Sequence, residues 1–455
     1  MTVVGAAAER RPAAKPSAPG LWCARAAKAD LFISGARVVD PLAGLDDELD
    51  VLILKGKVAA VGAGLTPPEG VRRIGAAGKL LMPGFVDPHV HLRTPGREDE
   101  EDIASGTAAA AAGGFVAVFA MANTDPVVDT APVLQSLAQG AQAEAVVPVG
   151  FHAAMSRGLC GEQLTEMYEL AQAGAVAFSD DGRPPANAYL LRRALQYAKL
   201  TGRHVAVHAE DAALSGKGVM HEGAVSARLG LAGIPSVSES IAVAAALEVA
   251  GYEDACLHLC HLSTAAALEH LARAKEAGTA VTTEVCPHHL VYTDEALLSL
   301  DPSLKMNPPV RQESDRAALV AALASGLIDC VATDHAPHST EEKEVPFEEA
   351  PFGCIGLETA FAVLYDVLVG PGAVSLPILV ERMSQAPARV MGMRVPTIKE
   401  GEAADLCLAD TAAGWTVSRQ TLRSRSHNSP WLGADLRARI VLTVAAGHVA
   451  FEAGA

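Results

Sequence analysis

Aromatic side chains are scarce in this chain of 455 residues. Phe, Tyr and Trp together make up 4% of the residues, whereas hydrophobic residues as a whole make up 50%. A core with so few aromatic rings must be mostly aliphatic, and this amount of apolar material is sufficient to bury a large one. The composition therefore predicts a globular protein with an extensive aliphatic core.

Positive charge is also in short supply. The chain has 36 Lys and Arg against 53 Asp and Glu, which gives a formal net charge of −17. Such a surface repels phosphate backbones, so nucleic acid is not an expected partner. No apolar run reaches the roughly 18 residues that a membrane-spanning helix requires, so no membrane association is expected either.

Compact cysteine spacing is absent as well. Eight cysteines are scattered along the chain without a CxxC pair, which indicates reduced thiols in a cytoplasmic protein rather than a disulfide framework. The first residues are rich in Ala, Pro and Arg and lack the apolar centre of a secretory signal. We therefore expect residues 1–28 to be a disordered tail.

Both ends of the remaining sequence are rich in strand-like segments. Runs of β-branched residues bounded by glycine occur in residues 30–62 and again in residues 404–451, and such runs are typical of hairpins. Because chain ends often lie close together, we expect residues 29–80 and 397–455 to form one small composite β-sandwich domain.

The middle of the sequence alternates between short apolar runs and helical stretches. Apolar strands that alternate with helices indicate a parallel sheet, and eight such units can close a barrel. We therefore predict an α/β fold with a metal-dependent (β/α)8 TIM barrel over residues 81–396. An open doubly wound sheet is the alternative, but no GxGxxG follows the first strand. The runs are Met82–His89, Phe115–Met121, Val146–His152, Ala175–Ser179, His204–His208, Cys256–His261, Ala280–Val285 and Ile328–Thr333.

Histidine and aspartate residues gather where the predicted strands end. Active sites of barrels lie at the carboxyl ends of their strands, and residues two apart on a strand face the same side. Imidazole nitrogens and carboxylate oxygens are ligands that Zn²⁺ accepts. Five strand ends that each offer such groups predict a metal centre. The residues are His89 and His91, Asp180 or Asp181, His208, His261, and Asp334.

Six short sequence blocks occur in order around these strand ends. The first block resembles the opening of metal barrels of the amidohydrolase superfamily, and the complete set resembles the dihydroorotases. The resemblance extends from about residue 30 to the end of the chain. The blocks are Asp87-Pro-His-Val-His-Leu-Arg93, Met121-Ala-Asn-Thr-Asp-Pro126, Ser179-Asp-Asp-Gly182, Lys305-Met-Asn-Pro-Pro-Val-Arg311, Thr333-Asp-His-Ala-Pro-His338 and Phe352-Gly-Cys-Ile-Gly-Leu-Glu-Thr359.

The resemblance implies a reversible, zinc-dependent hydrolysis of the cyclic amide of (S)-dihydroorotate to N-carbamoyl-L-aspartate in de novo pyrimidine (UMP) biosynthesis. Two Zn²⁺ ions per subunit would be bridged by Asp181 and a hydroxide. The periodicity of the strand does not distinguish Asp180 from Asp181, but the matching block favours Asp181. One ion would be held by His89, His91 and Asp334, and the other by His208 and His261.

The same resemblance implies roles in catalysis and substrate binding. Asp334 would move the proton from the nucleophile to the leaving nitrogen. Arg93 lies two residues beyond His91 and so faces the same mouth, and its planar guanidinium suits the substrate carboxylate. Asn123, Asn307 and His338 would also bind the substrate, and backbone groups of Phe352 and Gly353 would contact its ring.

There are two alternative functions, of which the second belongs to another functional class. Hydantoinases and allantoinases are also cyclic amidohydrolases, but they usually bridge their metals with a carboxylated lysine, and no lysine lies near the fourth strand end. Some dihydroorotase-like chains are non-catalytic partners of aspartate carbamoyltransferase and have lost metal ligands, whereas every matched ligand position is filled here. The resemblance leaves a homodimer and an association with that transferase as options.

A second group of cysteines and histidines lies in two neighbouring predicted strands or at their ends. We interpret these side chains as core or wall residues of the barrel and not as a further zinc cluster. They are Cys256, His258, Cys260, Cys286, His288 and His289.

Overall fold

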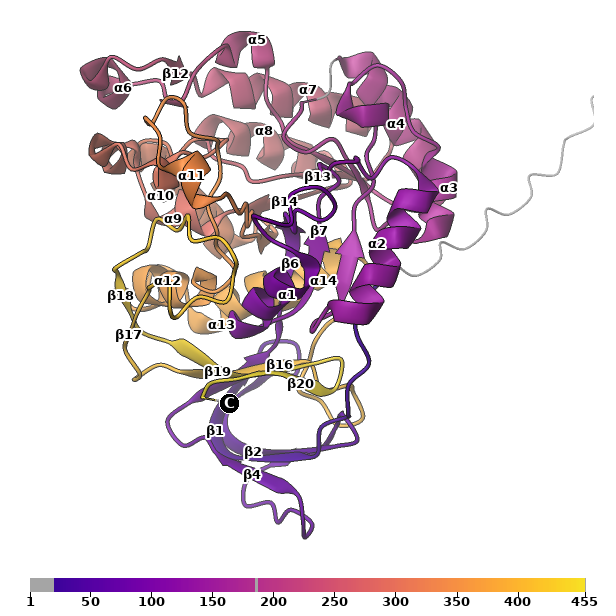
Figure 1. Ribbon diagram of the computed structural model, residues 1–455, viewed down its shortest axis with the longest axis vertical. Helices are drawn as coiled ribbons and strands as arrows, with labels where there is room; N and C mark the ends of the chain where they lie inside the picture. Colours follow the sequence, from indigo (N-terminus) through magenta and orange to yellow (C-terminus); the bar gives the residue numbers. More distant parts are fainter. Residues whose placement is uncertain (1–19, 185–186, 455) are drawn as a thin grey trace, which may run out of the picture.

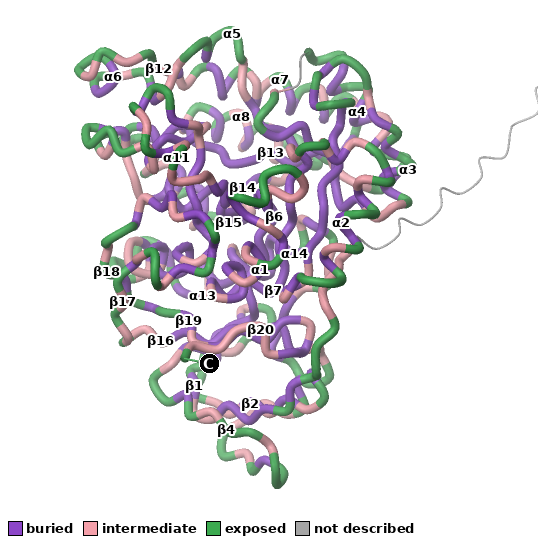
Figure 2. Tube along the Cα trace, in the orientation of Figure 1, coloured by how far each residue is buried: buried purple, intermediate pink, exposed green. Residues whose placement is uncertain are grey.

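The protein consists of a barrel surrounded by helices and a smaller β-sheet unit, which lies below the barrel in Figure 1. The computed structural model describes residues 20–184 and 187–454. Figure 2 shows buried residues concentrated inside the barrel and exposed residues along its outer loops. Within these ranges, no helix combines the length and the apolar character that crossing a bilayer demands.

Eight parallel strands form a closed ring at the centre of the barrel. Parallel ladders join β6 to β8 in one sheet and β9 to β15 in a second. Two parallel bridges, Ala153–Phe178 and Val90–His335, connect the two sheets at both edges. The ring is therefore closed, and the predicted (β/α)8 fold is confirmed. Its strands are β6 Phe85–Val90, β7 Phe115–Ala120, β8 Val149–Phe151, β9 Phe178–Ser179, β10 Val205–Val207, β13 Leu257–Leu259, β14 Val281–Val285 and β15 Cys330–Val331.

Helices cover the outside of the ring, and local sequence sets where they begin. Helix α1 follows Asp102, whose carboxylate accepts a hydrogen bond from the Ser105 amide at 2.7 Å. Helix α4 follows Asn187, which caps it in the same way, and ends at Gly202 with φ of 67°, a conformation that glycine adopts without steric cost. The main helices are α1 Ile103–Ala112, α2 Ala131–Glu144, α3 Met167–Ala173, α4 Ala188–Thr201, α7 Val237–Glu253, α8 Ala265–Glu276, α10 Glu313–Ser325, α12 Ala360–Leu364, α13 Leu376–Val380 and α14 Ala386–Val390.

Shorter elements lie in the loops between the strands and helices. Two π-helical segments, Tyr365–Val369 and Glu381–Gln385, continue α12 and α13. Three 3₁₀ turns span Arg157–Leu159, Asp294–Ser299 and Pro302–Leu304. The others are α5 Ala212–Ser215, α6 Ala224–Leu229, α9 Pro287–Val291, α11 Thr340–Lys343, β11 Met220–His221, β12 Gly233–Ile234, β17 Trp415–Thr416 and β18 Asp435–Leu436.

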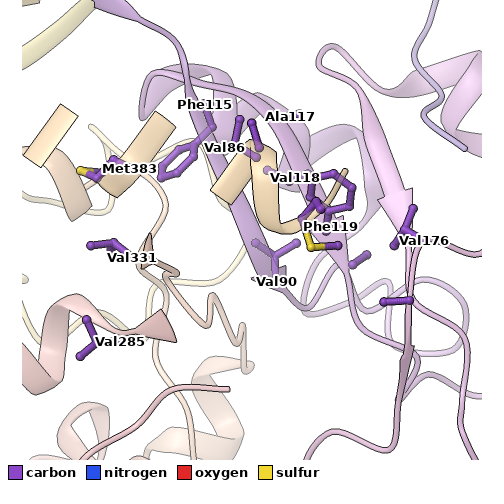
Figure 3. Packing of buried hydrophobic residues seen from close by; sticks show 14 of the residues in the cluster. Val86, Val90, Phe115, Ala117, Val118, Phe119, Val176, Val285, Val331 and Met383 are labelled. Carbon is purple, nitrogen blue, oxygen red and sulfur yellow. The ribbon is translucent and has the colours of Figure 1, made fainter. Parts of the chain in front are cut away.

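The barrel wall is packed on both of its faces. Every residue of β6 and β7 is buried, as expected for parallel strands that are covered by helices. Phe115, Val86 and Val90 lie together in this wall (Figure 3), and the rings of Phe85 and Phe115 meet edge to face at 5.8 Å. Truncating such a buried phenylalanine to alanine typically costs about 3–5 kcal/mol. This packing holds the strand ends in fixed positions.

The two ends of the chain share one eight-stranded sheet, in which β16 pairs with β5. The sheet curls over its own core, because Lys57 at the start of β3 forms a bridge with Ala403, just before β16. Aliphatic side chains such as Ile53 and Leu406 fill the space that it encloses. The strands are β1 Leu31–Asp40, β2 Leu45–Leu54, β3 Lys57–Gly62, β4 Arg72–Gly75, β5 Leu80–Pro83, β16 Leu406–Asp410, β19 Arg439–Ala445 and β20 His448–Glu452.

Three details differ from the sequence-based expectations. Disorder was expected up to residue 28, whereas Trp22 exchanges two backbone hydrogen bonds with Val149 of β8 at 3.0 and 2.8 Å; residues 1–19 lie outside the described part. The apolar run Met82–His89 forms two strands, because β5 belongs to the sheet unit and β6 begins after Gly84. Residues 415–436 pack against the barrel residues Ile355 and Val363 and not in the sheet unit.

Candidate active site

The polar residues at the strand ends converge on one cavity. The cavity has a volume of about 220 Å³ and opens at the carboxyl ends of the barrel strands. His89 lies beneath it and is fully buried. Its lining includes five of the six predicted metal ligands and all six predicted substrate-binding residues: His91, Asp181, His208, His261, Asp334, Arg93, Asn123, Asn307, His338, Phe352 and Gly353.

Asp181, which follows β9, lies among three imidazoles. Its Oδ1 is 3.5 Å from Nε2 of His89 and 3.5 Å from Nε2 of His261, and its Oδ2 is 3.6 Å from Nε2 of His91. Burial alone would raise the pKa of this carboxyl, but the charge of His89 and the close approach of His261 and His89 hold it well below the usual range. Asp181 is therefore a carboxylate at the centre of the site.

The neighbouring Asp180 points away from the cavity. Its Oδ1 accepts hydrogen bonds from the amides of Met155 and Ser156 at 2.8 and 2.9 Å, and its Oδ2 accepts one from the Ser156 hydroxyl. Asp180 also begins a turn, in which the Arg183 amide donates to its carbonyl at 2.9 Å, so the chain changes direction between the two aspartates. The structure directs Asp181 into the cavity and leaves Asp180 to anchor the loop after β8.

Asp334 approaches the same group of imidazoles from the end of β15. Its Oδ1 lies 3.0 Å from Nε2 of His91 and 3.5 Å from Nε2 of His89. Burial would raise the pKa of Asp334, but the charges of His89 and His91 outweigh it, and the pKa lies well below its ordinary value. The second carboxylate of the site is thus ionised as well.

His208 and His261 face each other across the cavity. Nδ1 of His208 lies 3.1 Å from Nε2 of His261. Two imidazole nitrogens at this separation cannot both present bare lone pairs, so a proton or a cation must lie between them. The other nitrogen of His208 contacts Glu210 Oε2 at 2.9 Å.

The donor set fits a metal centre. Nε2 of His89 and Oδ1 of Asp181, which lie 3.5 Å apart, are both buried and have no hydrogen-bond partner, although most such atoms in proteins are paired. The ligand atoms of His89, Asp181 and His261 lie within 4.8 Å of one another, and so do those of His89, His91 and Asp334. Nitrogen and carboxylate ligands of this kind suit Zn²⁺ and related divalent ions.

Two groups orient the imidazoles from outside this cluster. Glu284 of β14 contacts Nδ1 of His89 at 2.7 Å and Nε2 of His258 at 3.1 Å. Asn123 Oδ1 lies 2.9 Å from Nδ1 of His91. A partner on Nδ1 fixes the tautomer and leaves Nε2 to act as a ligand. His258 is therefore a buried wall residue, as the sequence indicated.

Arg93 stands at the mouth of the cavity. Its Nε donates to the carbonyl of Pro337 at 2.9 Å and lies 3.1 Å from a carboxylate oxygen of Glu100, while Nη2 lies 3.3 Å from Nε2 of His338. Burial lowers the pKa of Arg93 from its usual value, but a guanidinium stays charged in proteins. Held in this way, it presents a fixed cation to the cavity.

The remaining predicted substrate residues complete the rim. Asn307 donates to Glu210 Oε2 at 2.8 Å, and His338 contacts the backbone carbonyl of Phe352 at 2.8 Å. Gly353 has φ of 123°, and a side chain there would meet Cβ of Ala336 at 2.7 Å. Glycine is therefore required at position 353 for the loop to approach the cavity this closely.

Three residues of the site have backbone conformations that are unusual for side chains with a Cβ. The φ angles are 56° for Arg93, 32° for His261 and 48° for Asp334. Conformations of this kind cost on the order of 1–3 kcal/mol and concentrate at functional sites. The packing of the surrounding barrel therefore stabilises these three residues in unfavourable backbone conformations that direct their side chains to the site.

Sequence reasoning missed two acidic residues of this site. Glu210 follows His208 by two positions directly after β10, so its proximity to the cavity could have been inferred from the spacing. The contacts with His208 and Asn307 bring the pKa of Glu210 to about 2 against the effect of burial. Glu284 lies in β14 beside two threonines, and its sequence position does not reveal the contact with His89.

Comparisons with known proteins agree with this arrangement. A family profile described as dihydro-orotase-like matches residues 78–267. Dihydroorotases from Trichlorobacter lovleyi and Citrifermentans bemidjiense are 45% and 46% identical, each over 93% of this chain and over 99% and 100% of the relative. Among solved structures, an L-hydantoinase (dihydropyrimidinase) from Arthrobacter aurescens superimposes with a TM-score of 0.84 at 28% identity, covering 94% of this chain and 97% of that one.

Proposed function

The chain belongs to the dihydroorotase family, and from this premise we propose that its cavity hydrolyses the cyclic amide of dihydroorotate to N-carbamoyl-aspartate and catalyses the reverse ring closure. The observation that carries the proposal is the meeting of Asp181 and Asp334 with the imidazoles beneath a rim that contains Arg93. Such a cavity offers ligands for cations at its base and a fixed positive charge for a carboxylate at its mouth.

We assign the base of the cavity to two zinc ions. His89, His91 and Asp334 would hold one ion, His208 and His261 the other, and Asp181 would bridge them. Bound there, a metal pair polarises a carbonyl and lowers the pKa of water. The ligand sets are supported by the unpaired buried Nε2 of His89 and Oδ1 of Asp181 and by the partners that Glu284 and Asn123 provide for His89 and His91.

We assign to Asp334 the transfer of a proton from the attacking water to the leaving ring nitrogen. Amide hydrolysis requires that the attacking water lose a proton and that the leaving ring nitrogen gain one. Asp334 is ionised, lines the cavity and lies 3.0 Å from Nε2 of His91, so its carboxylate can accept the first proton and deliver it to the nitrogen. In ring closure the same group would run these transfers in the opposite order.

We assign to Arg93 the binding of the substrate carboxylate. Burying a carboxylate without a partner is costly, and Arg93 is the one arginine among the described residues that line the cavity. Its own contacts with Pro337 and Glu100 keep it in place before substrate arrives. Asn123, Asn307 and His338 would supply further hydrogen bonds, and the segment of Phe352 and Gly353 would contact the ring.

The proposal extends to the setting of the reaction. We place the enzyme in de novo pyrimidine biosynthesis in the cytoplasm, on the basis of the family and of the reduced, scattered cysteines. A homodimer and an association with aspartate carbamoyltransferase stay predictions of the resemblance.

A hydantoinase activity is the second candidate, because the fold superimposes on an L-hydantoinase. None of the described residues that line the cavity is a lysine, so the carboxylated lysine of those enzymes has no counterpart. The higher identity to dihydroorotases, 45% against 28%, also favours the first candidate.

A substrate panel tests the proposed function. The purified chain is assayed by absorbance with dihydroorotate, hydantoin and allantoin, before chelation, after chelation and after return of Zn²⁺. We expect turnover of dihydroorotate that is lost with the metal and restored with it. A preference for hydantoin or allantoin would replace the proposal with the second candidate, and full activity without metal would refute it.

A further inference from the structure

A second group of metal-binding side chains lies just beyond the end of β14. Cys286 follows this strand, and His288 and His289 lie in the first turn of α9. A sulfur atom and one nitrogen from each ring lie within 4.8 Å of one another. The exposed fractions are 0% for Cys286 and 2% for each histidine, so water cannot readily satisfy these atoms.

The two imidazoles present nitrogens that lack partners. Nε2 of His289 donates to the carbonyl of Pro308 at 2.8 Å, so its Nδ1 carries the lone pair, and this buried atom has no hydrogen-bond partner. Nδ1 of His288 contacts the thiol of Cys354 at 3.7 Å, and its Nε2 is likewise buried without a partner. Both rings are thus oriented from one side and unpaired on the other.

Unpaired buried nitrogens favour a bound cation at this place. The unpaired nitrogens of His288 and His289 have lost their hydrogen bonds to water without a replacement. One cation that accepted the lone pairs of both rings would give each nitrogen a partner. Burial raises the pKa of Cys286, so the cation would have to displace the proton of this thiol.

The sequence indicated wall residues here, but the unpaired atoms favour another role. We propose that Cys286, His288 and His289 form a third metal site, separate from the candidate active site, for a borderline-soft transition-metal ion such as Zn²⁺. Thiolate and imidazole are the ligands that such ions prefer. Binding would form a metal–sulfur bond, break the S–H bond of Cys286 and release that proton to solvent. The thiol of Cys354 is not one of the ligands, because it faces the opposite nitrogen of His288.

A competing group is less suited to bind a further ion. The ligand atoms of His89, Cys260 and Glu284 also lie within 4.8 Å of one another. There, however, Nδ1 of His89 and Glu284 already contact each other at 2.7 Å, and Glu284 also contacts His258. A metal at this place would have to break existing contacts, whereas the site at Cys286 has unpaired atoms.

Cobalt uptake tests the proposal, because a thiolate ligand gives a near-ultraviolet charge-transfer band that imidazole and carboxylate do not. The full chain is stripped of metal and reloaded with Co²⁺, and cobalt per chain is measured by atomic emission. We expect the wild type to show the thiolate band and Cys286→Ala to lose both the band and one cobalt per chain. The matched control Cys407→Ala, also fully buried but in β16, should keep both.

Two further variants guard against a trivial result. His289→Gln keeps the thiol, so it should lose the band and one cobalt even if Cys286→Ala fails to fold. Cys260→Ala should retain the band. The proposal is overturned if the wild type lacks the band, or if His289→Gln keeps the wild-type band and cobalt count. It is also overturned if the band depends on Cys260 instead of Cys286. The dihydroorotate assay on the same samples reports the proposed function separately.

Discussion

Replacing either of the two adjacent aspartates after β9 by asparagine removes one carboxylate at nearly the same place in the chain. Asp181 faces three imidazoles at 3.5–3.6 Å, whereas Asp180 faces the loop of Met155 and Ser156. If Asp181 is the bridge between two metal ions, Asp181→Asn should sharply reduce metal binding in the cavity and turnover, and Asp180→Asn should change only stability.

The magnitudes follow from these contacts. Loss of a group that merely orients a metal ligand costs about 10–100-fold in affinity, so loss of a direct ligand should cost at least about 100-fold. Metal ions contribute several kcal/mol to catalysis of this type; about 4 kcal/mol corresponds to a loss of roughly 10³-fold in kcat for Asp181→Asn. In Asp180→Asn the amide keeps one acceptor oxygen for the Met155 and Ser156 amides, and the loss of a charge-assisted hydrogen bond should cost about 1.5–3 kcal/mol of stability.

Three measurements on each variant separate these effects. Atomic emission gives metal per chain, dihydroorotate absorbance gives kcat, and urea unfolding gives stability. We expect Asp181→Asn to be folded, metal-poor and inactive, and Asp180→Asn to be less stable with metal content and turnover like the wild type. The reverse pattern, with metal lost at Asp180 and retained at Asp181, would refute the assignment of the bridge.

Three further predictions concern Arg93 and Glu284 at the site and Lys343 of α11, whose ammonium donates to the carbonyls of Pro302 and Pro351. Arg93→Lys should raise KM roughly 10–100-fold with little change in kcat, because the planar fork for the substrate carboxylate is lost; an unchanged KM in steady-state kinetics would remove Arg93 from substrate binding. Glu284→Gln should weaken metal affinity about 10–100-fold by loosening His89, and competition with a chelator measures this; wild-type affinity would show that the contact is only structural. Burial lowers the pKa of Lys343 to about 8 in the folded protein, so above this pH the unfolded chain binds more protons than the folded one. The free energy of unfolding should therefore rise by up to about 3 kcal/mol relative to Lys343→Met as pH increases from about 8 to about 10.4. Urea midpoints of the two proteins that run in parallel across this pH range would contradict the prediction.

Much of the barrel could be predicted because its signals are local. Each strand is a short run of apolar residues, and each helix follows a capping residue such as Asp102 or a stop such as Gly202. The residues at the carboxyl ends of parallel strands must then lie on one rim. For this reason, the meeting of His91, His261 and Asp334 in one cavity could be inferred without coordinates.

Other features depend on contacts that sequence spacing does not reveal. The choice between Asp180 and Asp181 depends on the twist of a two-residue strand and on the distant amides of residues 155 and 156. Glu284 looks like one more polar residue in a strand that also contains two threonines, and only the closed ring brings it against His89. Likewise, Trp22 pairs with Val149 because the β9 segment bonds to this edge of β8 only from Phe151 onward, although the neighbours of Trp22 in sequence are typical of disorder.

The central claim is that four imidazoles and two carboxylates surround a pair of metal ions at the top of the barrel. Anomalous diffraction from crystals of the catalytically active protein at the zinc absorption edge tests it most directly. The account predicts two adjacent peaks in the cavity, in contact with His89, His91, Asp181, His208, His261 and Asp334. An active protein whose anomalous peaks all lie elsewhere, or which has no peak at all, would contradict it.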